Sequence, residues 1–118
     1  EVLASHPNVA ECAVLGIADD LKGQIPLGFI VLKSGVNRDA QLIEKECVSL
    51  VREKIGAVAA LKTVITINRL PKTRSGKILR GTISKIADKK DWKMPATIDD
   101  PMILTEIGNA MKARGIGQ

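Results

Sequence analysis

The chain has 118 residues, a length that suits one folded domain. Hydrophobic residues make up 45% and charged residues 26% of it, ordinary proportions for a globular protein that exclude a disordered segment. The net charge of +5 favours anionic partners, but with no Tyr, one Phe and one Trp the chain has few of the aromatic side chains on which single-stranded nucleic-acid binders stack bases. A phosphorylated small molecule fits the charge better, and we expect no nucleic-acid partner.

The first predicted elements are the end of a helix and two strands. Residues 1–7 begin without Met and are interpreted as the end of an amphipathic helix, so we expect a fragment of a longer protein. Strand formers predict strands over 11–17 and 25–33. We expect Pro26 at the start of the second strand, where a missing N–H does little harm. The connection is too short for a helical crossover, so these two strands are expected to be antiparallel.

The next predicted element is an amphipathic helix over 39–55, with Asn37 or Asp39 as its N-cap and Gly56 as its end. Apolar residues at three-to-four spacing indicate its buried face. They are Leu42, Ile43, Cys47, Leu50, Val51 and Ile55. A third strand is predicted over 63–67.

A polar, basic loop over 68–77 follows, and then a short helix that ends at residue 87. Its apolar side is formed by Ile78, Leu79, Ile83, Ile86 and Ala87. In the tail, Asp100 followed by Pro101 is typical of a helix start, and a final helix is predicted over 101–114.

The element order predicts the α+β class: a small antiparallel or mixed sheet of about three strands plus a short hairpin, packed with helices. Residues 1–87 are expected to form one domain, and residues 88–118 a C-terminal tail with a helix. The sequence has no signal peptide and no apolar run long enough to span a bilayer, so we expect no membrane partner. Cys12 and Cys47 form no CxxC pair and are interpreted as buried thiols in a reducing compartment.

The chemistry-bearing segment reads Pro-Lys-Thr-Arg-Ser-Gly-Lys-Ile-Leu-Arg over residues 71–80, with four cations and no acid. Gly76 permits a sharp turn before Lys77, and such a loop can direct an ammonium group at phosphate or carboxylate oxygens. A P-loop is excluded, because Pro71 stands where that motif needs glycine and Ile78 where it needs Ser or Thr. From the residues alone, a solvated basic hairpin is an equally good interpretation.

Residues 71–77 with Arg80 resemble the C-terminal lysine motif of acyl-CoA synthetases in the adenylate-forming superfamily. Residues 6–16, 22–24 and 51–56 resemble acetyl- and propionyl-CoA synthetases at the expected spacings, and residues 97–101 are most similar to propionyl-CoA synthetases. The likeness implies an enzyme that makes acyl-CoA from a short-chain carboxylate such as acetate or propionate, ATP and CoA, through acyl-AMP. It also implies a missing N-terminal adenylating domain as partner, so that the fragment alone would be inactive.

The resemblance assigns roles to individual residues. Lys77 is expected to assist acyl-AMP formation and to be a target of a lysine acetyltransferase and deacetylase. Arg52 is expected to contact a phosphate of CoA, and Arg74 to contribute to cofactor binding. His6, with the backbone carbonyls of Ala4 and Val9, is expected to bind Mg²⁺. The compartment is expected to be the cytoplasm or the mitochondrial matrix.

Two other interpretations stay open at this point. One is an adenylating domain from another branch of the superfamily, such as a peptide-synthetase or luciferase relative. The other is a basic nucleic-acid-binding module, which the scarcity of aromatic residues disfavours.

Overall fold

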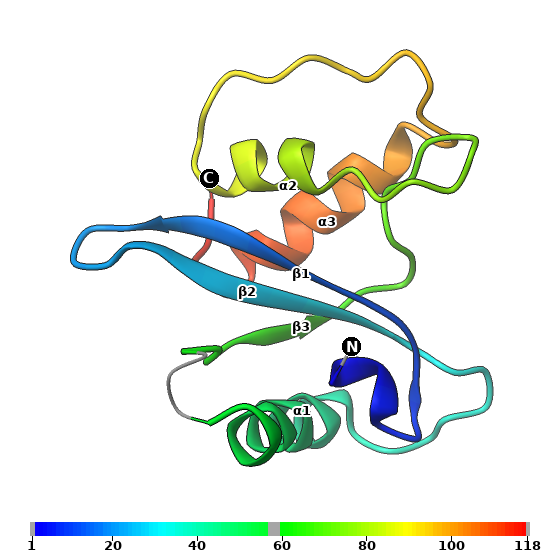
Figure 1. The fold of residues 1–118 in the computed structure, drawn as a ribbon. Helices are drawn as coiled ribbons and strands as arrows, with labels where there is room; N and C mark the ends of the chain where they lie inside the picture. The colour runs from blue at the N-terminus through cyan, green and yellow to red at the C-terminus, as the bar shows by residue number, and fades with distance from the viewer. Residues whose placement is uncertain (1, 57–59, 118) are drawn as a thin grey trace. The chain divides into compact units, whose positions relative to one another are not determined.

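The computed structural model describes residues 2–56 and 60–117, and the chain divides into two compact units, residues 1–68 and 69–118 (Figure 1). The first unit contains a 3₁₀ helix, η1 (Leu3–Ser5), the three-stranded sheet and helix α1. The second contains helices α2 and α3. The expected α+β class is therefore confirmed. Among the described helices, none combines the length and apolarity that crossing a bilayer requires.

Strands β1 (Val9–Asp19) and β2 (Gly23–Leu32) form the antiparallel hairpin that the sequence predicts, and both are longer than expected. The turn is closed by the Asp19 carboxylate, which accepts hydrogen bonds from the backbone N–H groups of Leu21 (3.2 Å) and Lys22 (2.9 Å). Asp commonly makes such bonds in turns, and here they extend both strands to the turn.

Pro26 lies inside β2 rather than at its start, so the sequence prediction of its position is wrong. It is paired with Gly16 of β1. The N–H of Gly28, two residues on, bonds to Thr63 beside β3, so the nitrogen of Pro26 also faces away from β1. The pairing of β2 with β3 begins only at Gly28. A proline is tolerated because its missing donor faces an unpaired stretch of the strand edge.

Strand β3 (Val64–Thr66) pairs in parallel with β2, so the sheet is mixed and has the order β1-β2-β3. Helix α1 (Ala40–Lys54) connects β2 to β3, as a parallel crossover requires. Asp39 caps the helix by accepting the N–H of Gln41 (3.0 Å), as predicted. Gly56, with φ of +102°, follows the helix and adopts the left-handed conformation that glycine allows.

Helix α1 covers one face of the sheet next to η1 (Figure 1). Its buried residues Ile43, Cys47 and Val51 join a core cluster with residues of η1, β1, β2 and β3. The predicted apolar face is wrong at Leu42 and Ile55, which are 51% and 59% exposed. Leu42 is rotated about 100° from Ile43 around the axis, and Ile55 lies beyond the last helical turn.

Both cysteines are free thiols, and Cys47 is fully buried. Burial raises the pKa of the Cys47 thiol to about 11, so this side chain stays protonated at neutral pH. Cys12 is half-buried beside the same core cluster. The prediction of a small hydrophobic role holds fully for Cys47 and in part for Cys12.

Glu44 lies on the buried face of α1, which apolar periodicity did not predict. Its carboxylate accepts hydrogen bonds from the backbone N–H (2.9 Å) and the hydroxyl (2.7 Å) of Thr66 at the end of β3. A buried carboxylate is tolerated only when its oxygens are bonded in this way. Glu44 therefore joins the helix to the last strand of the sheet.

The second unit packs two helices together, α2 (Arg80–Ala87) and α3 (Met102–Lys112). Helix α2 begins two residues later than predicted, because Ile78 pairs with Lys72 as an isolated β-bridge and is extended. Helix α3 confirms the predicted tail helix, and the Asp100 carboxylate accepts the N–H of Met102 (3.0 Å) at its start. The buried faces of the two helices are formed by Ile83, Ala87, Ile103, Leu104, Ile107 and Met111.

Replacing Glu44 with Ala is expected to lower the free energy of unfolding by about 1–3 kcal/mol, because the buried N–H of Thr66 would lose its acceptor. Urea denaturation monitored by circular dichroism measures the change. The matched control is Glu53→Ala, which removes an exposed glutamate from the same helix and should change stability by less than about 0.5 kcal/mol. Equal effects of the two changes would contradict a role for Glu44 in joining α1 to β3.

Candidate functional site

The basic segment folds as a short hairpin in the second unit. The N–H of Thr73 donates to the carbonyl of Lys77 (2.8 Å), and the N–H of Leu79 donates to the carbonyl of Pro71 (3.0 Å). Lys72 and Ile78 pair between these two bonds. Pro71 is buried, so the base of the hairpin is anchored while its tip is in solvent. The predicted short hairpin is confirmed, and it contains the whole motif from Pro71 to Lys77.

The turn before Lys77 depends on Gly76, whose φ of +92° is in the left-handed region. Its N–H donates to the carbonyl of Thr73 (2.9 Å). The hydroxyl of Thr73 accepts the N–H of Lys77 (3.1 Å) and is hydrogen-bonded to Ser75 (3.0 Å). Thr73 therefore holds the backbone of Lys77 at both its N–H and its carbonyl.

The side chains at the tip of the hairpin are exposed. Arg74, Ser75 and Lys77 all lie in solvent, and neither Arg74 nor Lys77 forms an ion pair with another described residue. The structure thus brings Arg74 and Lys77 together in one turn, as the sequence predicts. A rigid backbone that presents two cationic groups with no internal partner can bind an anion that approaches from outside.

Sequence reasoning did not identify Thr73 as a residue that holds the turn. Its position four residues before Lys77 gives the only local signal, since hydroxyl side chains bond to nearby backbone in turns.

Arg52 lies in the last turn of α1, in the first unit, and its side chain is exposed. It makes no ion pair within the described part of the chain. Its backbone carbonyl accepts the N–H of Gly56 (3.0 Å) at the helix end. The guanidinium is therefore available to a phosphate group, which is the chemistry expected of it.

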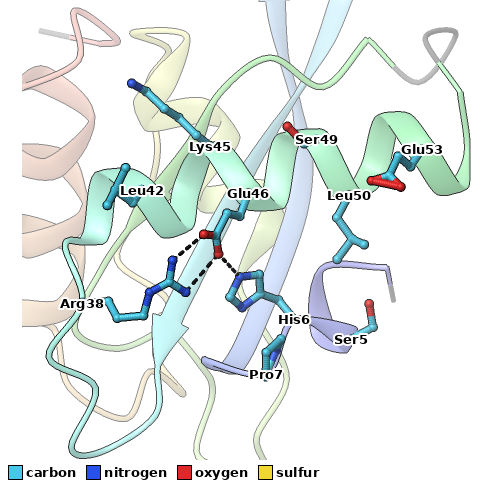
Figure 2. A pocket seen from close by; sticks show the side chains of 10 residues that line it. All are labelled: Ser5, His6, Pro7, Arg38, Leu42, Lys45, Glu46, Ser49, Leu50 and Glu53. Atoms are coloured by element: carbon cyan, nitrogen blue, oxygen red, sulfur yellow. Dashed lines mark hydrogen bonds and ion pairs between the residues drawn. The ribbon is translucent and has the colours of Figure 1, made fainter.

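His6 is only 6% exposed, and its ring is held by two hydrogen bonds. Nε2 lies 2.7 Å from a carboxylate oxygen of Glu46 in α1. Nδ1 accepts the backbone N–H of Asn8 (3.1 Å), which assigns the ring proton to Nε2. Arg38 makes a two-pronged contact with the same carboxylate, so His6 and Arg38 point toward Glu46 from opposite sides (Figure 2).

The expected Mg²⁺ site does not fit this geometry. Both ring nitrogens of His6 are already engaged, so the imidazole has no lone pair to offer a cation. Ala4 in η1 and Val9 in β1 have aliphatic side chains, so only their backbone carbonyls could bind a cation. In the described residues, no group of three His, Cys, Asp or Glu side chains could hold a metal. We therefore derive no chemical step through magnesium at His6.

An open groove of about 540 Å³ lies beside the triad of His6, Glu46 and Arg38, between η1 and α1 (Figure 2). Its lining mixes charged, hydroxyl and apolar side chains. They are Ser5, His6, Pro7, Arg38, Leu42, Lys45, Glu46, Ser49, Leu50 and Glu53. Two cations, Arg38 and Lys45, and two carboxylates, Glu46 and Glu53, line it, so their formal charges cancel and the groove has no net preference for an anion. No local sequence pattern indicated the triad, because His6 and Glu46 are 40 positions apart.

Comparisons with known proteins give three consistent likenesses. The sequence model of the AMP-binding enzyme C-terminal domain matches residues 1–77. An uncharacterised protein of Pseudomonas aeruginosa is 53% identical over 99% of this chain and 19% of its own length. The mitochondrial acyl-CoA synthetase short-chain family member B of Dictyostelium discoideum is 50% identical over 91% of this chain and 16% of its own length.

Among solved structures, an acyl-CoA synthetase of Brucella canis is similar with a TM-score of 0.64 and 33% identity. The similarity covers 71% of this chain and 15% of that protein. The chain thus spans less than a fifth of the length of these relatives.

The Glu46 triad predicts an acid-dependent change in stability. Hydrogen bonds from Arg38 and then from His6 lower the pKa of Glu46 to about 2. A carboxylate with a lowered folded-state pKa stabilises the fold above its unfolded pKa of about 4.3, and this contribution is lost as the pH falls toward 2. The melting temperature of the original chain should therefore exceed that of Glu46→Gln at pH 5–7, with a gap that closes toward pH 2.

Thermal melts at intervals between pH 7 and pH 2 measure this gap. The control is Glu53→Gln, which changes an exposed glutamate of the same helix that has no ion pair with a described residue. Its melting temperature at pH 7 should lie close to that of the original chain, because no ion pair is lost. A pH-independent gap for Glu46→Gln would show that the triad is not formed in solution.

Proposed function

This chain belongs to the AMP-binding enzyme C-terminal domain family, and we propose that it is the mobile C-terminal domain of a short-chain acyl-CoA synthetase. The parent enzyme would make acyl-CoA from a carboxylate such as acetate or propionate, ATP and CoA, through an acyl-AMP intermediate. Residues 1–87 would form the family domain and residues 88–118 a tail. The family match ends at Lys77, and a relative that is 50% identical is named a short-chain acyl-CoA synthetase.

Lys77 is the residue that we propose acts in the first half-reaction. A carboxylate must approach the α-phosphorus of ATP, and both reactants are anionic, so negative charge accumulates on oxygens in the transition state. An ammonium group placed at those oxygens stabilises that charge, most strongly where water is excluded. The observation that carries the proposal is an exposed Lys77 with no ion-pair partner in the described residues, at a turn whose backbone is fixed by Thr73.

The hairpin geometry supports this role over a purely solvated charge. A lysine that is only solvated needs no fixed backbone. Here three hydrogen bonds between Thr73 and the backbone of Gly76 and Lys77 hold the turn that carries Lys77. The lysine stem adds mobility to a fixed base, so its ammonium can follow the charge that moves as the adenylyl group passes to the carboxylate and pyrophosphate leaves. Arg74 in the same turn would contribute to binding the nucleotide phosphates.

Arg52 would act in the second half-reaction, in which the CoA thiol attacks the acyl carbonyl and AMP leaves. Its exposed guanidinium can form two parallel hydrogen bonds to a phosphate of CoA. Arg52 and Lys77 lie in different units of the chain. We propose that each serves one half-reaction, and that the domain adopts one pose for each of the two steps.

The partner of this domain would be an N-terminal adenylating domain that holds most of the ATP and acyl pockets. The chain alone would then be inactive. Acetylation would neutralise Lys77 and stop adenylation, so a lysine acetyltransferase and deacetylase are proposed as regulators. Relatives with mitochondrial names occur, and we propose either the cytoplasm or the mitochondrial matrix as the compartment.

In the full-length enzyme, Lys77→Ala is expected to slow acyl-AMP formation by roughly 10²–10³-fold, the usual cost of one transition-state electrostatic contact. Thioester formation from supplied acyl-AMP and CoA should be spared. Carboxylate-dependent release of pyrophosphate measures the first step, and acyl-CoA formation measures the second.

The control for Lys77→Ala is Lys85→Ala, which removes an exposed lysine from α2 outside the hairpin and should leave both half-reactions intact. Survival of acyl-AMP formation in Lys77→Ala would refute the assignment. Equal loss of both steps would also count against it, because the proposed role is specific to adenylation.

Arg52→Ala is expected to raise the KM for CoA in the second half-reaction by about tenfold, since a charge-assisted bond to phosphate would be lost. Pyrophosphate release in the first half-reaction should be unchanged. Lys54→Ala, in the same helical turn, is the matched control for a general loss of positive charge. An unchanged KM for CoA in Arg52→Ala would contradict the proposed contact between Arg52 and a phosphate of CoA.

A further inference from the structure

A short segment of the tail, residues 97–99, pairs with the Lys77 hairpin at an isolated β-bridge. The N–H of Arg74 donates to the carbonyl of Thr97 (2.8 Å), and the N–H of Asp99 donates to the carbonyl of Lys72 (3.0 Å). Thr73 and Ile98 pair as an antiparallel bridge between these two bonds. Residues 97–99 thus pair with residues 72–74, one arm of the hairpin, through hydrogen bonds to Lys72 and Arg74.

Thr73 is the central residue of this pairing. Its own N–H faces the arm that carries Lys77, while the N–H of Arg74 and the carbonyl of Lys72 face the tail. Backbone groups of successive residues in a strand point to opposite sides, so one arm can be paired along both edges. A two-stranded hairpin alone is marginally stable in water, and the two hydrogen bonds to the tail add support to it.

The tail segment is itself anchored in the second unit. Ile98 is 5% exposed, so its side chain is buried at the point of pairing. Asp100, two residues on, forms an ion pair with Arg69 (2.8 Å). Arg69 also contacts Glu106 in α3 through two nitrogens (2.8 and 3.2 Å). Since Arg69 lies two residues before Pro71, it connects the entry of the hairpin to the start of α3.

We propose that residues 97–99, held in place by Arg69 and α3, are a positioning segment for Lys77. This proposal rests on the proposed function of Lys77 in acyl-AMP formation. The segment touches no reacting atom, and it acts by fixing the Lys72–Arg74 arm, from which Thr73 holds the Lys77 backbone. The family match ends at residue 77, so it assigns nothing to this segment.

The test is Asp99→Pro in the full-length enzyme, because proline removes the one N–H that bonds to Lys72. Displacement of a catalytic group by about 1 Å can cost as much as about a hundredfold in rate, so acyl-AMP formation should fall about ten- to a hundredfold. Thioester formation from supplied acyl-AMP should stay within about twofold.

Two matched variants separate loss of the Asp99 N–H from loss of its side chain and from the general effect of a proline in this segment. Asp99→Ala keeps the N–H and should behave like the original enzyme. Ala96→Pro adds a proline to the same segment at the second position of the turn closed by the bond from the Ile98 N–H to the Pro95 carbonyl (3.2 Å), where proline is well tolerated. Loss of acyl-AMP formation in either control would overturn the proposal.

A double-mutant cycle separates positioning from general structural damage. In a Lys77→Ala background, Asp99→Pro should change the residual rate of acyl-AMP formation by less than about twofold, because the group it positions is gone. An undiminished effect there, or an equal loss of both half-reactions, overturns the proposal. If Lys77→Ala itself leaves acyl-AMP formation intact, the proposed function fails; if only Asp99→Pro is silent, the positioning role alone fails.

Arg69 provides a second variant should Asp99→Pro fail to fold. Arg69→Met removes both ion pairs from a side chain that is 42% exposed, and should lower acyl-AMP formation selectively. Arg69→Lys retains a charge for one carboxylate and should recover part of the rate. Full activity in Arg69→Met, or equal loss in both half-reactions, would contradict the proposal that Arg69 holds residues 97–99 in place.

Discussion

The paired contacts between Thr73 and the backbone of Lys77 are the constraint on which the proposed site depends. The main chain of Thr73 donates to the Lys77 carbonyl, and its hydroxyl accepts the Lys77 N–H. These bonds close only because Gly76 adopts a positive φ, which other residues reach at a cost. The backbone of Lys77 is therefore fixed, whereas its four-carbon side chain can still rotate. A catalytic cation that must meet two different oxygens during one reaction needs that combination.

The charges of the described residues fall into two groups with different physical consequences. Arg38 and Arg69 each form ion pairs with carboxylates, and the hydrogen bonds that they donate to Glu46 and Glu106, respectively, raise the pKa of each guanidinium. Arg52, Arg74 and Lys77 have no such ion pair among the residues that the structure describes. Paired arginines stabilise local structure, whereas unpaired cations keep their electrostatic capacity for a ligand. The distribution explains how a basic domain can remain folded and still present positive charge to a phosphorylated substrate.

Much of the fold could be predicted from local sequence, and the failures have identifiable physical causes. The hairpin of β1 and β2, the capped helix α1 and the basic hairpin follow from strand formers, Asp39 and the Gly76 turn, which are short-range signals. Apolar periodicity placed Leu42 on the buried face of α1, although it is exposed. It also missed Glu44, because burial of this carboxylate depends on the hydrogen bonds that it accepts from Thr66, 22 residues away. Pro26 was misplaced because tolerance of a proline depends on which edge of the strand is paired.

The candidate site divides in the same way between local and long-range information. Lys77, Arg74 and their glycine turn are contiguous, so their association was predictable from the chain itself. The bridge between Thr73 and Ile98 and the contact of Arg69 with Glu106 join positions more than 20 residues apart, and no local pattern encodes them. The same distinction applies to His6. A lone histidine in the sequence is compatible with metal binding, but in the structure hydrogen bonds to Asn8 and Glu46 engage both of its ring nitrogens. A motif therefore identifies the group that can do chemistry, and tertiary contacts decide whether that group is held in place for it or used to hold the fold.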